Sequence, residues 1–111
     1  MLADLLIAPQ NELEWSRWSF AHRDQHNLIR QAIQKLYGVN LPDYQLDPIN
    51  FADFTSFLDN NQSAHNDMNG VLGLQSSNLE QVDFQNKAQL EAWIYLHRRE
   101  HEAAAFKLGI S

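Results

Sequence analysis

Cysteine is absent from this sequence of 111 residues. The chain therefore forms no disulfide and offers no thiolate as a nucleophile or metal ligand, which fits a reducing compartment such as the cytoplasm. Long apolar runs are also missing. The first segment, MLADLLIAPQ, is apolar but has no basic leader and is too short for a signal peptide or a membrane span. No membrane-spanning segment is expected.

Positive charge is scarce, with 8 Lys and Arg against 14 Asp and Glu and a formal net charge of -6. Such a field repels phosphate backbones, so direct binding to nucleic acid is not expected. The densest cationic spot is Arg98-Arg99, and Glu100 and Glu102 dilute it.

Recognisable catalytic motifs are missing as well. The sequence has no P-loop, no Gly-rich dinucleotide turn and no GxSxG elbow. Nothing marks one serine as a nucleophile, and no pair of carboxylates stands in an apolar setting. An enzyme is not excluded, but a non-enzymatic role is the stronger expectation.

The residues that are present predict one small globular domain. The chain is 44% hydrophobic, and three Trp, six Phe and three Tyr give a core bulk. We expect an all-α three-helix bundle with an extended N-terminal arm and two long loops. Residues 1–10 form the arm, residues 11–111 form a single helical domain, and the helices are expected at 11–37, 50–72 and 85–108.

Capping residues support these boundaries. Asn11 is a plausible N-cap with Glu14 three residues on, and Gly38 and Gly109 supply stop signals. The loop around Pro42 and Pro48 is long for a bundle, whose connections usually run about 2–8 residues. In an up-down-up arrangement, the first and third helices would run parallel.

Each expected helix carries one apolar stripe at 100° per residue, and all five histidines lie on these stripes. The first stripe contains Trp15, Trp18, His22, His26, Ile29, Ile33 and Leu36. The second contains Phe51, Phe54, Leu58, Asn61, His65, Met68 and Leu72. The third contains Leu90, Trp93, His97, His101, Ala104 and Leu108. Since an apolar stripe must be buried, we expect all five imidazoles to face the interior.

Two of these stripes share one spacing, because Trp18-His22-His26 matches Trp93-His97-His101 position for position. Imidazoles four residues apart on a helix are neighbours, and two such rings can bind one metal ion. The candidate ligands are His22, His26, His65, His97 and His101, and the candidate metals are zinc and iron. Glu100 could add an oxygen, whereas Asp24 and Asp67 are expected to point away.

Two other interpretations of the histidines remain open. Buried neutral rings could satisfy one another, with help from Asn61, Ser19, Gln25 or trapped water, and fix the register of the helices. Alternatively, some rings could lie partly exposed in a cleft or interface. A carboxylate-bridged di-iron site is disfavoured because the stripes lack an inward Glu.

Several apolar residues lie outside the stripes. Phe20, Tyr95 and Phe106 fall opposite them, and Leu2, Leu5, Leu6 and Ile7 make the arm apolar. The arm and loops could cover the aromatics, or these residues could form a protein–protein interface. The candidate interface residues are Leu2, Leu5, Leu6, Phe20, Tyr95 and Phe106.

Four segments, WSRWSFAHRDQH, YQLDPIN, AHNDMNGVLGL and AWIYLHRREHEAAAFKLGI, resemble small helical proteins encoded among the structural genes of tailed bacteriophages. The resemblance implies a virion component of the neck, connector or tail, located in the host cytoplasm or in the particle. The sequence thus predicts a structural or interaction protein with protein partners or a homo-oligomeric state, and a histidine-ligated metalloprotein as the alternative.

Overall fold

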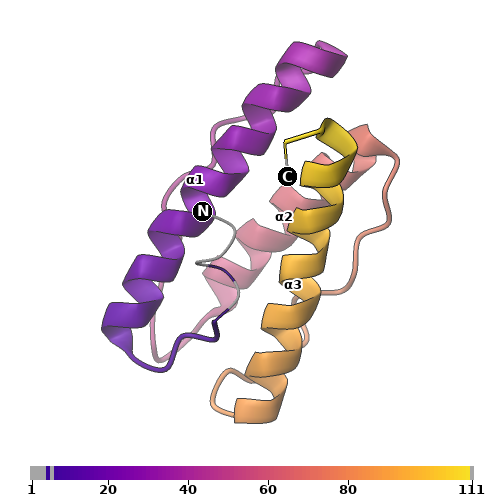
Figure 1. Ribbon diagram of the computed structural model, residues 1–111. Coiled ribbons are helices and arrows are strands. Elements are labelled where there is room, and N and C mark those ends of the chain that lie inside the picture. The colour runs from indigo at the N-terminus through magenta and orange to yellow at the C-terminus, as the bar shows by residue number, and fades with distance from the viewer. Residues whose placement is uncertain (1–4, 6, 111) are drawn as a thin grey trace.

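The computed structural model describes residues 5 and 7–110, and all three predicted helices are present (Figure 1). Helix α1 spans Glu12–Tyr37, α2 spans Thr55–Leu72 and α3 spans Lys87–Leu108. Each helix packs against the other two, and the described residues contain no β-strand. The prediction of an all-α three-helix bundle is confirmed.

The caps of α1 and α3 have a clear chemical basis, and Asn11 and Gly38 are the residues that the sequence predicted for α1. Asn11 Oδ1 accepts a hydrogen bond of 2.9 Å from Glu14 N at the start of α1, and Asn86 Oδ1 accepts one of 3.1 Å from Gln89 N. Each bond satisfies a backbone N–H that has no partner inside the helix. At the other end of α1, Gly38 adopts a φ of 69°, a left-handed conformation that glycine reaches without strain.

The second helix starts at Thr55 rather than at residue 50. Two local turns take up the intervening residues. Asn50 Oδ1 accepts from Ala52 N at 2.9 Å, and Asp53 Oδ1 accepts from Thr55 N at 2.9 Å. Short polar side chains compete with helical hydrogen bonds in this way, so they delay the first helical turn.

All three helices run in the same direction (Figure 1). Their first turns meet in one hydrophobic cluster, to which α1 contributes Trp15 and Trp18, α2 contributes Phe57, and α3 contributes Trp93. The expected up-down-up order is therefore wrong for α2. Each connection has to return along the bundle before the next helix can begin, which explains why both loops are long.

The shared direction divides the interior into three layers. The aromatic layer is the cluster formed by the first turns, and the aliphatic layer is formed by the last turns, from Ile29, Ile33, Met68, Leu72, Ala104 and Leu108. Between them lies the histidine layer, which consists of His22, His26, His65, His97 and His101. Two apolar layers thus close the histidine layer from both ends of the bundle.

The N-terminal arm packs back onto the domain where it is described. Leu5 is fully buried in the aromatic layer, whereas Ile7 is 73% exposed. Leu5 therefore offers no surface to a partner in this conformation. Leu2 and Leu6 lie outside the described residues. None of the described helices is apolar over a stretch long enough to cross a bilayer.

Candidate metal centre

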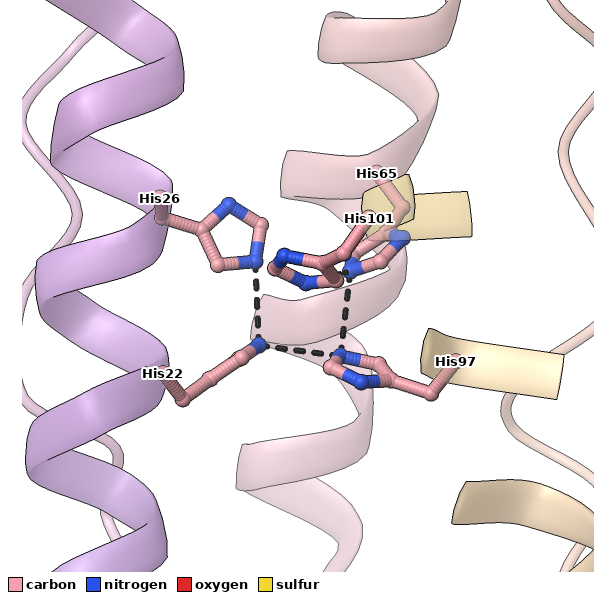
Figure 2. Close-up of side chains that lie close together, drawn as sticks. All are labelled: His22, His26, His65, His97 and His101. Atoms are coloured by element: carbon pink, nitrogen blue, oxygen red, sulfur yellow. Dashed lines mark hydrogen bonds between the residues drawn. The ribbon is translucent and has the colours of Figure 1, made fainter. Parts of the chain in front are cut away.

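The five imidazoles converge on one point between the three helices (Figure 2). Helix α1 supplies His22 and His26, α2 supplies His65, and α3 supplies His97 and His101. One nitrogen of each ring lies within 4.8 Å of the corresponding nitrogen of every other ring. Four rings are 0% exposed and His26 is 6% exposed. The prediction that all five imidazoles face the interior is confirmed.

The inward-facing atoms are the Nε2 nitrogens. His22 Nε2 lies 3.0 Å from those of His26 and His97, and His65 Nε2 lies 3.1 Å from that of His97 and 3.2 Å from that of His101. Two nitrogens bound to one zinc ion at about 2.0–2.1 Å are about 2.8–3.4 Å apart in octahedral or tetrahedral geometry. These four separations fall inside that range, and the ligand atoms of the whole set lie within 4.8 Å of one another.

Two buried carboxylates hold two of the rings from outside the centre. His22 Nδ1 donates to Asp47 Oδ2 at 2.8 Å, and His65 Nδ1 donates to Glu100 Oε1 at 3.0 Å. A ring that donates its Nδ1 proton keeps a free lone pair on Nε2, which is the form that binds a metal. Carboxylates in this position also fix the ring orientation and raise its basicity.

Each of these carboxylates accepts hydrogen bonds from more than one donor. Burial opposes ionisation of Glu100, but donors from His65, Ser77 N and Asn69 outweigh it and hold the pKa of Glu100 below its usual value. Asp47 accepts from His22 and from the hydroxyl of Tyr44. Burial, followed by the neighbouring Asp47, raises the pKa of Tyr44, so its hydroxyl remains a donor.

Burial favours the neutral form of four of the five rings. Burial, with the adjacent imidazoles adding to it, holds the pKa values of His26, His97 and His101 well below the usual value. Burial also lowers the pKa of His65, although Glu100 opposes that shift. The lowered pKa of Glu100 favours its charged form just outside these rings, and a divalent cation at the centre would be attracted to it.

One buried nitrogen has more acceptors around it than a single proton can satisfy. His97 Nε2 lies 3.1 Å from Asn61 Oδ1 as well as close to the lone pairs of His22 and His65. A neutral imidazole carries one N–H, so a network of hydrogen bonds alone leaves some of these acceptors unsatisfied. Asn61 is fully buried, and its amide oxygen is a further candidate ligand.

Aromatic side chains hold the rings in place. Trp18 stacks on His22 with ring centroids 4.5 Å apart, and Trp93 stacks on His97 at 4.7 Å. These equivalent contacts follow from the spacing that the two stripes share. Tyr44 stacks on His26 at 4.2 Å with an interplanar angle of 10°. The loop between α1 and α2 therefore supports the centre through Tyr44 and Asp47 together.

The three acidic residues that the sequence analysis considered, Glu100, Asp24 and Asp67, differ in their distance from the histidines. Glu100 lies beside His65 and accepts its proton, so it supports a ring from outside the cluster. Asp24 is paired with the neighbouring Arg23, and Asp67 is exposed. Sequence reasoning missed Asp47 and Tyr44, because an irregular loop has no periodicity. The sequence did hold one signal for them: in the segment YQLDP, Asp47 follows Tyr44 by three positions within an unusually long connection.

The interface residues predicted on the outer faces lie at the surface. Phe20 is 47% exposed, Tyr95 is 49% exposed and Phe106 is 77% exposed. The guanidinium of Arg23 lies 5.2 Å from the ring centroid of Phe20, and that of Arg98 lies 5.3 Å from the centroid of Tyr95. The described arm and loops thus leave these three aromatics largely uncovered.

Fold and site together define the class of protein: a three-helix bundle with a buried cluster of five histidines that could hold a metal ion. Comparison with protein families, with curated proteins and with solved structures finds no match to the chain. The function must therefore be inferred from the side chains of the site.

Proposed function

We propose that the protein binds one divalent transition-metal ion in the histidine layer. The observation that carries this proposal is the convergence of five Nε2 atoms, two of whose rings donate Nδ1–H to buried carboxylates. That combination supplies lone pairs at the centre and compensating negative charge just outside it. A structural role follows, since one ion would join all three helices at mid-height.

Zinc and iron are the metals that this donor set suits best. Imidazole binds both, and the absence of thiolate ligands disfavours Cu(I). Structural zinc sites are almost always four-coordinate, so zinc would use four of the rings. Iron(II) would accommodate all five imidazoles and, with the amide oxygen of Asn61, a six-coordinate N5O set.

Metal analysis of the native chain tests this proposal. The protein should be purified without a polyhistidine tag, and native mass spectrometry with elemental analysis should give about one zinc or iron per chain. The double variant H97A/H101A removes two ligands and should bind no metal. A content below about 0.2 metal per chain in the wild type, after growth with both metals supplied, would favour a hydrogen-bonded histidine network instead.

A second candidate function is protein interaction within a bacteriophage particle. The exposed aromatics Phe20, Tyr95 and Phe106 favour it, because large aromatic side chains are enriched at interfaces. The two functions are compatible, since a metal-stabilised bundle can serve as a structural component.

Size analysis tests the interaction role. The chain should be run alone and with the products of neighbouring genes, and association should be lost in the triple variant F20S/Y95S/F106S. A chain that remains monomeric and binds none of those products would contradict the interaction role without affecting the metal proposal.

A further inference from the structure

The five rings of the histidine layer are not equally accessible. His26 is 6% exposed, whereas the other four are fully buried. A cavity of about 210 Å³ lies against His26, between α1, α2 and residues 41–45 of the loop. Three further hollows in the described part of the chain are lined by none of the five histidines. His26 therefore offers a route from this cavity to the centre.

His26 also lacks the carboxylate partner that fixes two of its neighbours. His22 and His65 are each fixed through Nδ1 by a buried carboxylate. His26 contacts His22 through Nε2 at 3.0 Å, stacks on Tyr44, and makes edge contacts with His65 and His101. In Figure 2 its second nitrogen points away from the cluster. His97 and His101 also have no partner on Nδ1, but they are fully buried, so His26 is the ring without a carboxylate partner that borders the cavity.

Tyr44, which covers His26, belongs to a loop rather than to a helix. Its backbone is held by Asn27, whose Oδ1 accepts from Tyr44 N at 2.8 Å, and its hydroxyl is held by Asp47. Movement of this short segment would open the cavity toward His26 without disturbing the packing of the helices. The cavity walls combine apolar Ile33 and Met68 with polar Asn60 and Ser63.

We propose that His26 is the exchangeable ligand of the metal and that this cavity is a binding site for a small monodentate ligand of the ion. The proposal rests on the metal centre proposed above. In the exchange, the bond from the metal to His26 Nε2 breaks and a bond from the metal to the incoming donor atom forms, with no change of oxidation state. His22, His65, His97 and His101 keep the ion in place.

The size of the cavity defines the class of ligand. Sites for drug-sized molecules usually enclose about 300–1,000 Å³, and the cavity is smaller than that. Azide and cyanide are of suitable size, and each binds a metal through one terminal atom without a change of oxidation state. The probe for the experiment is azide, which is stable and does not require a change of oxidation state.

The test uses the Co²⁺-substituted full-length chain, because the visible absorption of Co²⁺ reports its ligands. Azide should change the spectrum saturably in the wild type. Ala64→Phe, which fills the cavity without removing a ligand, should weaken azide binding about tenfold or more while Co²⁺ stays bound. The matched control is Ala103→Phe on the exposed face of α3, which lines a different hollow, and it should bind azide as the wild type does.

A second variant keeps the test decisive if Ala64→Phe does not fold. His26→Ala should retain Co²⁺, bind azide more tightly than the wild type, and recover a wild-type-like spectrum when imidazole is added. Co²⁺ binding with no spectral response to azide in the wild type and in His26→Ala would overturn the exchange proposal alone. Failure of the wild type to bind Co²⁺, zinc or iron would overturn the metal centre and this inference with it.

Discussion

Asp47 and Glu100 each control one histidine from outside the cluster. Both are buried, and each accepts the Nδ1 proton of a ring whose Nε2 faces the centre. Since a bare Nε2 lone pair is what a cation requires, these carboxylates determine which nitrogen can act as a ligand. The affinity of the site for metal therefore depends on residues that do not touch the ion.

Replacing Asp47 with asparagine should weaken metal binding about 10–100-fold, the usual effect of losing such a partner. The amide keeps the shape of the side chain but removes the charge that balances the cation. Competition with a chromophoric chelator measures the affinity. Asp43→Asn in the same loop is the matched control, because Asp43 forms an exposed ion pair with Arg30 and should leave the affinity unchanged. Equal affinities of D47N and the wild type would contradict this role.

The metal-free protein should lose stability as the pH falls below about 6.5, the pKa of an unfolded histidine. The folded-state pKa values of His26, His65, His97 and His101 are all lowered, first of all by burial. Below pH 6.5 the unfolded chain therefore binds more protons than the folded chain, and acid favours unfolding. Each such histidine can contribute up to about 1.4 kcal/mol per pH unit.

Thermal unfolding in the presence of a chelator, at several pH values from 8 to 5, measures this effect. We expect a constant melting temperature at the alkaline end and a progressive fall toward pH 5. A melting temperature that does not change over the whole interval would contradict burial of neutral rings.

At the scale of the helices, the sequence predicted which faces are buried but not the direction of α2. A helical stripe has the same period when read from either end, so periodicity carries no information about direction. The missing information lay in the loops, whose length indicates a return along the bundle. Leu36, which the stripe placed inside, is 58% exposed because α1 extends beyond its neighbours' apolar contacts.

The site was also predictable only in part, from the residues that lie on regular helices. The five histidines share the buried faces of regular helices, and so periodicity identified all of them. Asp47 and Tyr44 reach the centre from an irregular segment, where position in space depends on tertiary packing rather than on a repeat. Periodicity therefore identifies candidate ligands on helices more readily than the loop residues that support them.

The common direction of α1 and α2 can be measured with pairs of spin labels, since the natural chain has no cysteine to interfere. Labels at Ser16 and Ser56, near the starts of the two helices, should be closer together than labels at Ser16 and Gly70. A Cβ atom added at Gly70 would meet no other atom within 4 Å, so the label should not disturb the fold. The opposite order of distances would indicate antiparallel helices.

For the molecule as a whole, a bound ion should contribute a large part of the stability. A ligand that binds only the folded chain stabilises it by about 2.7 kcal/mol at a concentration 100 times its Kd. For a domain of this size that corresponds to a shift in melting temperature on the order of 10 °C. The bundle should therefore remain folded under mild heating with the ion bound and unfold without it.

Chelation followed by reconstitution measures that contribution. EDTA treatment should lower the melting temperature by this amount, and added zinc or iron should restore it. The variant H97A/H101A is the control, because it should respond to neither treatment. A wild-type melting temperature unaffected by either step would contradict a stabilising metal.

Because the three helices point the same way, their backbone dipoles add instead of cancelling as they would between antiparallel neighbours. Each helix places about half a positive elementary charge at its first turn and the same negative charge at its last. The aromatic end of the molecule therefore carries a partial charge of about +1.5 from the peptide groups alone, and the aliphatic end carries the opposite. Two copies that each carry a net charge of -6 repel each other in dilute salt, and the dipoles make that repulsion weakest when unlike ends face each other. About 0.1 M salt screens this orientation preference beyond roughly 10 Å.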